Sequence, residues 1–308
     1  MKTFVPDYYP QFQCIAGKCR HSCCEGWGID IDEESLARFK QVQGEIGERL
    51  RRDIAEDEEG AHFILKEGDR CPFLNEDNLC DLILALGDDC LCQICADHPR
   101  FRNFFADRTE MGLGMCCEEA TRLILTREEP MRLIEWEDDG FDDEADETEG
   151  DIIALRDAFI KIAQMREMSV AERVEELLRQ TGLSMPERDM AQWAQFFMNL
   201  ERMDEKWAQR LALLGKSAAA DAEPIAENAK EQLLVYYLTR HIAGAAQDGD
   251  MQGRLLLCVL LWKIVMKMCS ASGADMAGLI DIARMCSSEI EYSDENLNAV
   301  LDELAYLA

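Results

Sequence analysis

The chain has 308 residues with a formal net charge of −30 at pH 7, and 48% of its residues are hydrophobic. This hydrophobic content supports a sizeable core and excludes a wholly disordered chain. A polyanion of this kind repels nucleic acid and anionic lipid, so we expect neither nucleic acid nor a membrane as partner. The acidity keeps the protein soluble and could also attract a basic protein partner.

The chain shows no sign of export or membrane insertion. Its opening segment, MKTFVPDYYPQ, lacks the apolar stretch of a secretory signal. The longest apolar run, at 255–262, is interrupted by Lys263 and is too short to span a bilayer. We therefore expect a cytoplasmic protein. Thiols stay reduced in that compartment, so clustered cysteines indicate metal or redox chemistry more than disulfides.

The N-terminal part is predicted to be irregular, with short helices and hairpins. Apolar residues from Leu36 to Ile54 recur at spacings of three and four, which predicts one helix, with Asp30 or Asp32 as its N-cap. The other expected elements are hairpins of 62–66 with 71–74 and of 101–105 with 110–115, a helix over 81–87 that ends at Gly87, and a helix over 118–126.

A strongly acidic run is expected to separate two domains. From Glu135 to Asp151, eleven of seventeen residues are acidic and none is basic. Such a run repels itself and has little to bury, which is typical of a mobile linker or an exposed loop. We therefore expect a cysteine-rich domain at 1–134, an acidic linker at 135–150 and a helical domain at 151–308.

The C-terminal part has an almost purely helical pattern. A capping box at 169–172 starts one helix, and Gly182 follows its end. Pro224 suits the first turn of another helix, and Ser293 can cap the last one. Residues 254–268 are apolar on most sides and predict a central buried helix. The expected fold class is mainly α, an irregular cysteine-rich part with short β-hairpins followed by a helical bundle.

Cysteine is concentrated early in the chain. Eleven of the fourteen cysteines precede residue 118, whereas Cys258, Cys269 and Cys286 lie in helical patterns typical of buried small hydrophobes. Thiolates bind zinc and iron, and four sulfurs complete a tetrahedral site or hold an iron–sulfur cluster. Grouped on short turns, the early cysteines predict a metal or cluster site, with no clean zinc-ribbon pair. They are Cys14, Cys19, Cys23, Cys24, Cys71, Cys80, Cys90, Cys92, Cys95, Cys116 and Cys117.

Two residues that follow these cysteines in the sequence are candidates for a role at the same site. Trp27 follows the cysteine pair, and we expect it to pack over the metal site rather than to contact substrate. His98 follows Cys95 and could supply a nitrogen ligand, although a hydrogen-bonded turn histidine is the commoner case.

Four cysteine-bearing motifs occur in a fixed order along the chain: FQCIAGKCRHSCCEGWGIDID, CPFLNEDNLCDLILALGDD, CADHPRF and GLGMCCEEATRLIL. This ordered set resembles the flagellin lysine-N-methylase family, and ENAKEQLLVYYLTRHIAGAAQDGD is similar to that family's C-terminal region. The resemblance implies transfer of a methyl group from S-adenosylmethionine to lysine amines of flagellin. It also implies an iron–sulfur cluster, a four-iron cluster being expected and zinc the alternative.

Matching the motifs residue by residue implies eight metal ligands. Cys90, Cys92 and Cys116 depart from the family pattern, and the chain is shorter than typical members. The implied ligands are Cys14, Cys19, Cys23, Cys24, Cys71, Cys80, Cys95 and Cys117.

The residues themselves leave the reaction open. No glycine-rich nucleotide turn follows a predicted strand, so a cofactor site must be built differently. A methyltransferase must also remove the proton of the lysine amine. The candidate bases cannot be ranked; they are Tyr8, Tyr9, His21, His98 and the many carboxylates. The alternatives are an enzyme of this family acting on another lysine-bearing protein, and a non-enzymatic metal-binding or redox-sensing module whose helical part docks a partner.

Overall fold

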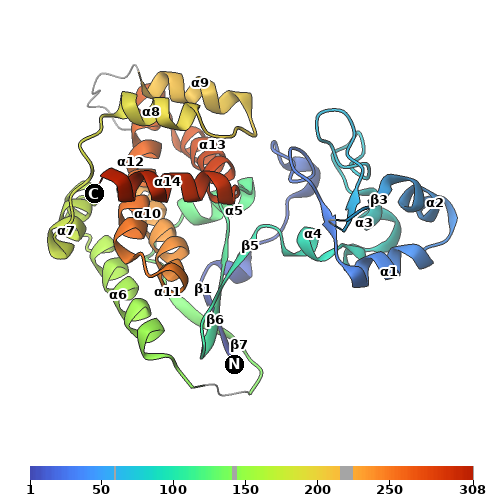
Figure 1. Ribbon diagram of the computed structural model, residues 1–308, viewed down its shortest axis with the longest axis horizontal. Coiled ribbons are helices and arrows are strands. Elements are labelled where there is room, and N and C mark those ends of the chain that lie inside the picture. Colours follow the sequence, from blue (N-terminus) through green and yellow to red (C-terminus); the bar gives the residue numbers. More distant parts are fainter. Residues whose placement is uncertain (59, 141–143, 216–224, 308) are drawn as a thin grey trace. The chain divides into compact units, whose positions relative to one another are not determined.

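The computed structural model describes residues 1–58, 60–140, 144–215 and 225–307. The chain is mainly α-helical, as predicted (Figure 1). Its contacts divide it into two compact units. Unit 1 comprises Met1–Phe12 together with Phe101–Ala308, and unit 2 comprises Gln13–Arg100.

This division differs from the boundaries predicted at 134 and 151. Strand β1 (Lys2–Pro6) pairs with β7 (Leu133–Asp138), so both ends of the expected cysteine-rich domain belong to unit 1. The acidic run therefore begins in strand β7, and helix α6 begins within it at Glu147. Of the expected linker, only residues 141–143 lie outside the described part. An edge strand tolerates charge because one side faces solvent, and Lys2 Nζ lies 3.0 Å from a Glu135 carboxylate oxygen.

The sheet of unit 1 has the strand order β5-β6-β1-β7. Strand β5 (Arg100–Phe104) and strand β6 (Arg108–Leu113) form the predicted second hairpin, closed by a 2.9 Å bond from Phe105 N–H to the Arg108 carbonyl. Strand β1 runs parallel to β6 and antiparallel to β7.

Helices form the rest of unit 1 and bury most of its core. Helix α12 is almost wholly buried, as predicted for 254–268. The described helices are α5 (Glu118–Leu125), α6 (Glu147–Ala163), α7 (Val170–Thr181), α8 (Met190–Met198), α9 (Glu205–Leu214), α10 (Glu227–His241), α11 (Ala245–Asp248), α12 (Met251–Ser272), α13 (Met276–Cys286) and α14 (Asp294–Leu307), with short turns η1 (Tyr9–Gln11) and η4 (Ile242–Gly244) and the π-helical turn η5 (Ser287–Glu291).

Helix α12 is long and apolar enough to cross a membrane by length and composition, with a mean hydropathy of 1.8. However, 72% of that apolar window is buried inside the protein. A core helix of a soluble unit has this property, and α12 packs against α9, α10, α13 and α14.

The predicted helix ends in unit 1 are confirmed where they are described. Ser169 and Glu172 form the capping box of α7, and Gly182 ends that helix in the left-handed conformation. Ser293 Oγ accepts the Asn296 N–H at 3.2 Å at the start of α14. Pro224 lies outside the described residues.

Helix α10 carries buried charges that join it to other elements. The Glu231 carboxylate, 1% exposed, lies 2.7 Å from Arg173 Nη1 on α7 and 2.8 Å from Arg166 Nη2 after α6. Arg173 is also buried, and its guanidinium donates to the carbonyls of Ala163 and Met168. This ion pair is therefore fully hydrogen-bonded, which a buried pair requires.

A second buried carboxylate, that of Glu291, lies where η5 faces α10. It accepts a 2.9 Å hydrogen bond from Tyr236 Oη and lies 3.2 Å from Arg240 Nε and 2.6 Å from His241 Nε2. Burial disfavours its charge, but Arg240 and then His241 outweigh burial and lower the pKa of Glu291. Burial likewise lowers the pKa of His241, so a neutral imidazole with its proton on Nε2 donates to an anionic Glu291.

Unit 2 combines a three-stranded sheet, in the order β2-β4-β3, with four short helices. The core residues come from both and include two buried cysteines, Cys71 and Cys92. The elements are β2 (Asp30–Ile31), α1 (Glu33–Gln41), α2 (Gly44–Asp53), β3 (Ile54–Glu56), β4 (Ala61–Phe63), α3 (Asp81–Leu86) and α4 (Gln93–Asp97), with turns η2 (Ala16–Lys18) and η3 (Asp88–Cys90).

Two predictions for unit 2 need correction. The single helix expected from Leu36 to Ile54 is divided into α1 and α2, because the backbone is extended at Val42 and Gln43, with ψ of 130° and 170°. The hairpin expected between 62–66 and 71–74 is reduced to one bridge of Lys66 with Arg70. The cap of α1 by Asp32 and the end of α3 at Gly87 are confirmed.

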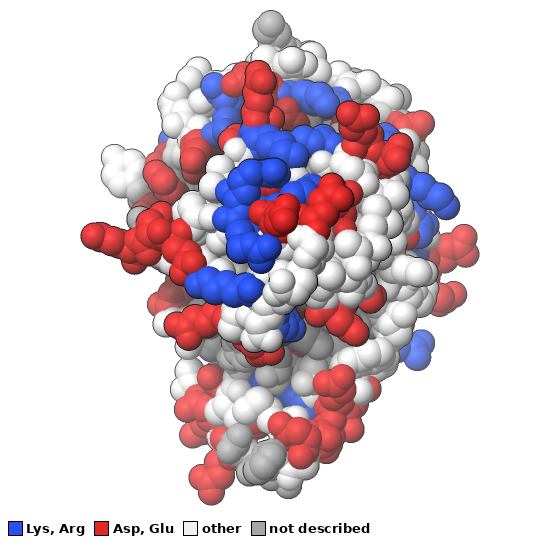
Figure 2. All heavy atoms as spheres, turned by 90° about the vertical axis from the view of Figure 1, so that its right-hand side faces the viewer, with Lys and Arg blue, Asp and Glu red and all other residues white. Residues whose placement is uncertain are grey.

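The surface carries the acidity seen in the composition. Figure 2 shows acidic side chains spread over the face that it presents, with lysine and arginine side chains forming a band among them. Many of these charges are paired within one helix, as in the i,i+3 pairs of Arg179 with Glu176 and of Arg122 with Glu119. Such pairs contribute little stability.

Replacing Glu231 should destabilise unit 1 strongly. Glu231→Gln leaves the buried Arg173 guanidinium without a counter-charge, which we expect to cost about 3 kcal/mol of unfolding free energy. Urea unfolding followed by circular dichroism measures the change. Glu176→Gln is the matched control, because it breaks an exposed pair with Arg179 and should leave the midpoint nearly unchanged. Equal midpoints for the two variants would contradict the buried-pair argument.

Candidate functional site

Nine of the fourteen cysteines lie in unit 2, where they line the most chemically distinctive part of the chain. Cys71 and Cys92 are buried in its core, and four further cysteines pack against that core, partly buried. These four are Cys24, Cys80, Cys90 and Cys95. Unit 2 thus brings together cysteines from three separate stretches of sequence.

Backbone hydrogen bonds join the first two stretches. The Cys71 N–H donates to the Cys24 carbonyl at 2.8 Å, which places the cysteine pair beside the CPFL segment. Leu74 and Cys80 then form an antiparallel bridge, and the Asp81 N–H donates to the Phe73 carbonyl at 2.8 Å. Cys80 therefore lies in the same region, at the start of α3.

Asp32 positions the third stretch. One of its carboxylate oxygens accepts the Ser35 N–H at 2.9 Å at the start of α1, and the other accepts the Gln93 N–H at 2.8 Å at the start of α4. Desolvation opposes the charge, but the bonds from Gln93 and Ser35 outweigh it and lower the pKa of Asp32 to about 2. Because Cys92 is the residue that precedes α4, Asp32 ties the Cys92–Cys95 pair to the β2–α1 junction.

The thiols differ sharply in acidity. A hydrogen bond from Cys23 is the main cause that lowers the pKa of Cys24 to about 7, and Ser22 adds a second. Burial instead raises the pKa of Cys71 to about 12 and that of Cys90 to about 11. Within the last pair, the hydrogen bond between Cys95 and Cys92 lowers the pKa of Cys92 and raises that of Cys95.

These interactions also show which thiols are neighbours. The charge of Cys24 acts on Cys71, Cys80 and Cys95, and Cys80 acts on Cys90. Cys90 and Cys92, which depart from the family pattern, therefore belong to the same neighbourhood as the implied ligands. For Cys92 the C-x-x-C spacing with Cys95 already indicates this, whereas for Cys90 only its position in the fold, near Cys80, does.

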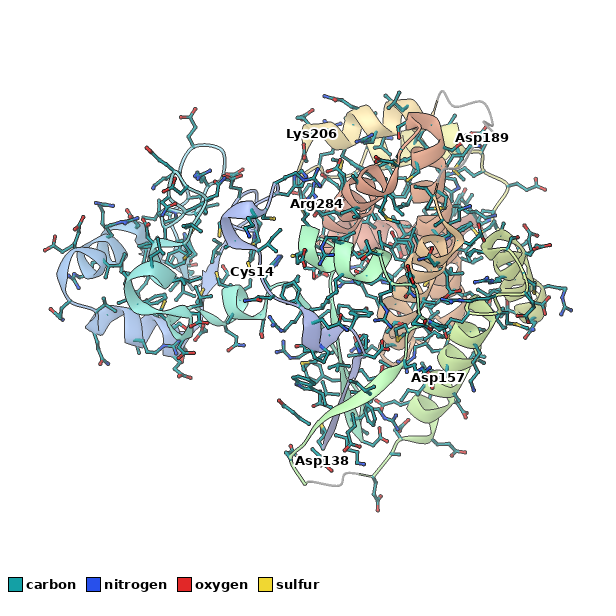
Figure 3. All side chains as sticks on the ribbon, turned by 180° about the vertical axis from the view of Figure 1, so that it is seen from behind. Cys14, Asp138, Asp157, Asp189, Lys206 and Arg284 are labelled. Atoms are coloured by element: carbon teal, nitrogen blue, oxygen red, sulfur yellow. The ribbon has the colours of Figure 1, made fainter. Side chains whose placement is uncertain are left out.

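The remaining implied ligands are placed differently. Cys14 is exposed beside η2, where its sulfur accepts the Ala16 N–H at 3.4 Å (Figure 3). The Cys19 thiol donates to the His21 carbonyl at 3.0 Å. Cys117 is the residue that precedes α5 and belongs to unit 1, as does Cys116, whose pKa burial raises to about 12.

The donor chemistry suits a soft cation, but the geometry is not that of a formed metal site. Thiols are the ligands that zinc and iron–sulfur clusters take. Within residues 1–58, 60–140, 144–215 and 225–307, no three cysteine, histidine or acidic side chains are gathered closely enough to hold a metal ion. The cysteines of unit 2 therefore form a concentrated thiol neighbourhood rather than a preformed coordination sphere.

Trp27 and His98 pack together beside these thiols. Their rings stack with centroids 6.3 Å apart, and the Trp27 indole donates to the Cys23 carbonyl at 2.7 Å. Burial lowers the pKa of His98 to about 4, so its imidazole is neutral at physiological pH. The tyrosines considered as bases, Tyr8 and Tyr9, are buried in unit 1.

The fold and the thiol neighbourhood define a mainly α-helical protein with a cysteine-rich unit. The chain is similar to the lysine-N-methylases of Salmonella typhimurium and Salmonella choleraesuis, each 28% identical over 144 residues. It is also similar to a flagellar biosynthetic protein, FliU, of Salmonella muenchen, 26% identical over 141 residues. Each match covers 42% of this chain.

The matched region spans only part of these relatives. It corresponds to 34% of the length of each lysine-N-methylase and to 79% of FliU. No protein-family model matches the chain. No solved structure matches it either.

The acidity of Cys24 predicts selective alkylation. In reduced, chelator-treated protein at pH 7, iodoacetamide should modify Cys24 well before the buried Cys71, because the thiolate is the nucleophile. Peptide mass spectrometry gives the rate at each cysteine. Cys23→Ala should slow Cys24 alkylation by removing the hydrogen bond that lowers its pKa, whereas Ser22→Ala should slow it less. An unchanged Cys24 rate in Cys23→Ala would refute this assignment.

Proposed function

We propose that this protein is a protein lysine N-methyltransferase that acts on a flagellar protein. The observation that carries the proposal is the similarity to two lysine-N-methylases and a flagellar biosynthetic protein. Flagellin is the expected substrate, and S-adenosylmethionine is the expected methyl donor. In the reaction the neutral lysine nitrogen forms a bond to the methyl carbon as the carbon–sulfur bond breaks. The amine must first lose a proton to a base.

The acidic surface supports a lysine-bearing substrate. A net charge of −30 attracts cationic segments and speeds their association, and acidic side chains are spread over the face shown in Figure 2.

We also propose that the cysteines of unit 2 bind an iron–sulfur cluster, with zinc as the alternative. The charge of Cys24 acts on Cys71, Cys80 and Cys95, which makes these four cysteines the first candidate ligands. Binding would require these sulfurs to move together and lose their protons, and it would contribute folding free energy to unit 2. No step of the methyl transfer is assigned to the cluster.

The reaction is tested with reduced protein, S-adenosylmethionine and flagellin from the same organism. Intact-mass spectrometry should show flagellin gaining mass in methyl-sized steps on surface lysines. Raising salt from 0.1 M to 1 M should slow the reaction, because the Debye length falls from about 10 Å to about 3 Å. Donor binding with no modified lysine would favour a different protein substrate. No donor binding would replace the enzyme proposal with a metal-binding or redox-sensing module.

The cluster is tested by anaerobic purification with iron, zinc and acid-labile sulfide analysis. The protein should contain iron and sulfide, and Cys71→Ser should lose most of both. Cys258→Ser is the matched control, because Cys258 is an equally buried thiol inside α12 and should retain them. Stoichiometric zinc without sulfide would establish the zinc alternative, and equal metal contents in the two variants would exclude Cys71 as a ligand.

A further inference from the structure

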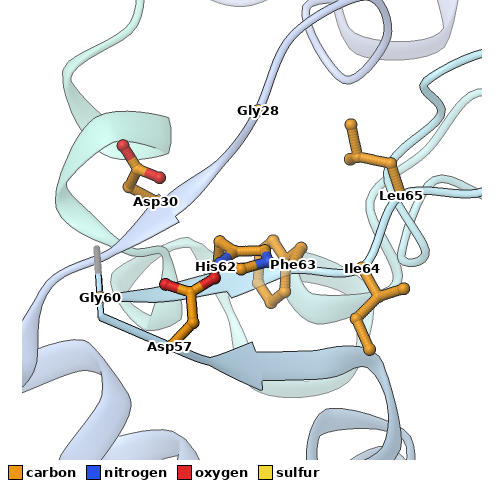
Figure 4. A pocket seen from close by; sticks show the side chains of 8 residues that line it. All are labelled: Gly28, Asp30, Asp57, Gly60, His62, Phe63, Ile64 and Leu65. Carbon is orange, nitrogen blue, oxygen red and sulfur yellow. Dashed lines mark ion pairs between the residues drawn. The ribbon is translucent and has the colours of Figure 1, made fainter.

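A cavity of about 480 Å³ lies against the sheet of unit 2, apart from the thiols (Figure 4). Its volume is within the range of small-ligand sites. Its walls combine carboxylates, an imidazole and aliphatic side chains, and two glycines leave its rim open. The residues that line it are Gly28, Asp30, Asp57, Gly60, His62, Phe63, Ile64 and Leu65.

The strand register explains why polar groups meet there. Asp30 on β2 and Ala55 on β3 both lie opposite His62 on β4, so all three side chains share one face of the sheet. The alternate residues Ala61 and Phe63 turn to the other face and are buried in the core. Asp30 and His62 both line the cavity on this open face.

Asp57 completes the polar side of the cavity. It lies in the β3–β4 turn, which is held by the bonds from Asp57 N–H to the Gly60 carbonyl, 3.1 Å, and from Gly60 N–H back to the Asp57 carbonyl, 3.3 Å. Its carboxylate faces the His62 ring, with 3.8 Å between Oδ2 and Nδ1 (Figure 4). His62 thus faces the Asp57 carboxylate across the cavity and has Asp30 as its neighbour on β2.

The other wall is aliphatic. Ile64 and Leu65 continue the chain beyond β4 and line the cavity, and Ile64 is 49% exposed. A site with carboxylates at one end and aliphatic side chains at the other matches a cation on a methylene stem. A lysine side chain has this composition, with a compact, strongly charged ammonium on a four-carbon stem.

We propose that this cavity binds the side chain of the substrate lysine. The ammonium lies between Asp30 and Asp57 and the methylenes lie along Ile64 and Leu65. This inference rests on the proposed function for the identity of the substrate, but binding of the side chain can be measured without methyl transfer.

The test is a titration of the full-length protein, labelled with ¹⁵N, with a short lysine-containing peptide. The amides of Gly28, Gly60, His62 and Ile64 should shift and saturate. The same peptide with norleucine in place of lysine, which lacks the amine, should leave them unchanged. Saturable shifts confined to other residues, or equal shifts with both peptides, would overturn the proposal.

Charge removal provides the second measurement. The double variant Asp30→Asn with Asp57→Asn should raise the Kd of the lysine peptide about tenfold, since each exposed ion pair contributes modestly to binding. Glu76→Gln is the control, because it removes an exposed charge of unit 2 that does not line the cavity. Both carboxylates are exposed on the open face, so circular dichroism should show intact folds. Equal affinity of the double variant and the control would overturn the site.

The methylation assay separates this inference from the proposed function. If the double variant methylates flagellin with a higher KM, this result supports the cavity. Methylation that the double variant leaves intact overturns the cavity and leaves the proposed function standing. Peptide binding with neither methylation nor binding of S-adenosylmethionine supports a lysine-binding cavity and refutes the methyltransferase. Peptide binding and donor binding without methylation support the cavity and favour a protein substrate other than flagellin.

Discussion

A carboxylate buried as completely as that of Glu291 is stable as an anion only when donors surround it. Its donors are Tyr236, Arg240 and His241, which all lie on α10. Tyr236 in turn accepts the Met115 N–H at 3.1 Å, from the segment that follows β6. One buried charge therefore sets the distance between η5, α10 and the sheet. The π-helical turn that carries Glu291 is an uncommon geometry that such a network can hold in place.

Unit 2 is stabilised differently. Its core is small, and it uses the thiols of Cys71 and Cys92 as apolar packing groups as well as potential ligands. The raised pKa of Cys71 keeps that thiol neutral, so its burial has no charge penalty while no cation is bound. A bound cation would reverse this preference, since a metal takes the thiolate. The same side chains can thus serve a packed core and a metal site, but not in the same protonation state.

Local sequence signals predicted local structure well. The capping box at Ser169, the helix end at Gly182 and the buried α12 all follow from short-range patterns, and the structure has them. The pairing of β1 with β7 could not be foreseen, because the partners are far apart and the acidic residues of β7 are typical of a linker.

The candidate site shows the same limit. The number and grouping of the cysteines predicted a thiol-rich region, whereas the neighbourhood of Cys95 with Cys24 and Cys71 depends on how Asp32 joins α1 to α4. The cavity beside His62 gave only a faint signal, a polar residue between the apolar Ala61 and Phe63. Recognising it requires the register that sets Asp30 opposite His62.

Unit 2 is inserted between β1 and the strands with which β1 pairs, and this arrangement has a consequence during synthesis. Lys2 pairs with Arg108, about a hundred residues later, so β1 leaves the ribosome with no partner for ~5–20 s at ribosomal rates. All of unit 2 emerges in that interval and can fold first, because its contacts are internal to residues 13–100. Once unit 2 has folded, it restrains both ends of the inserted segment. The flexible loop that must close when β1 pairs with β6 is then effectively shorter. The cysteine-rich unit would then act as a folding aid for the helical unit, and loss of its cysteines would reduce the yield of both.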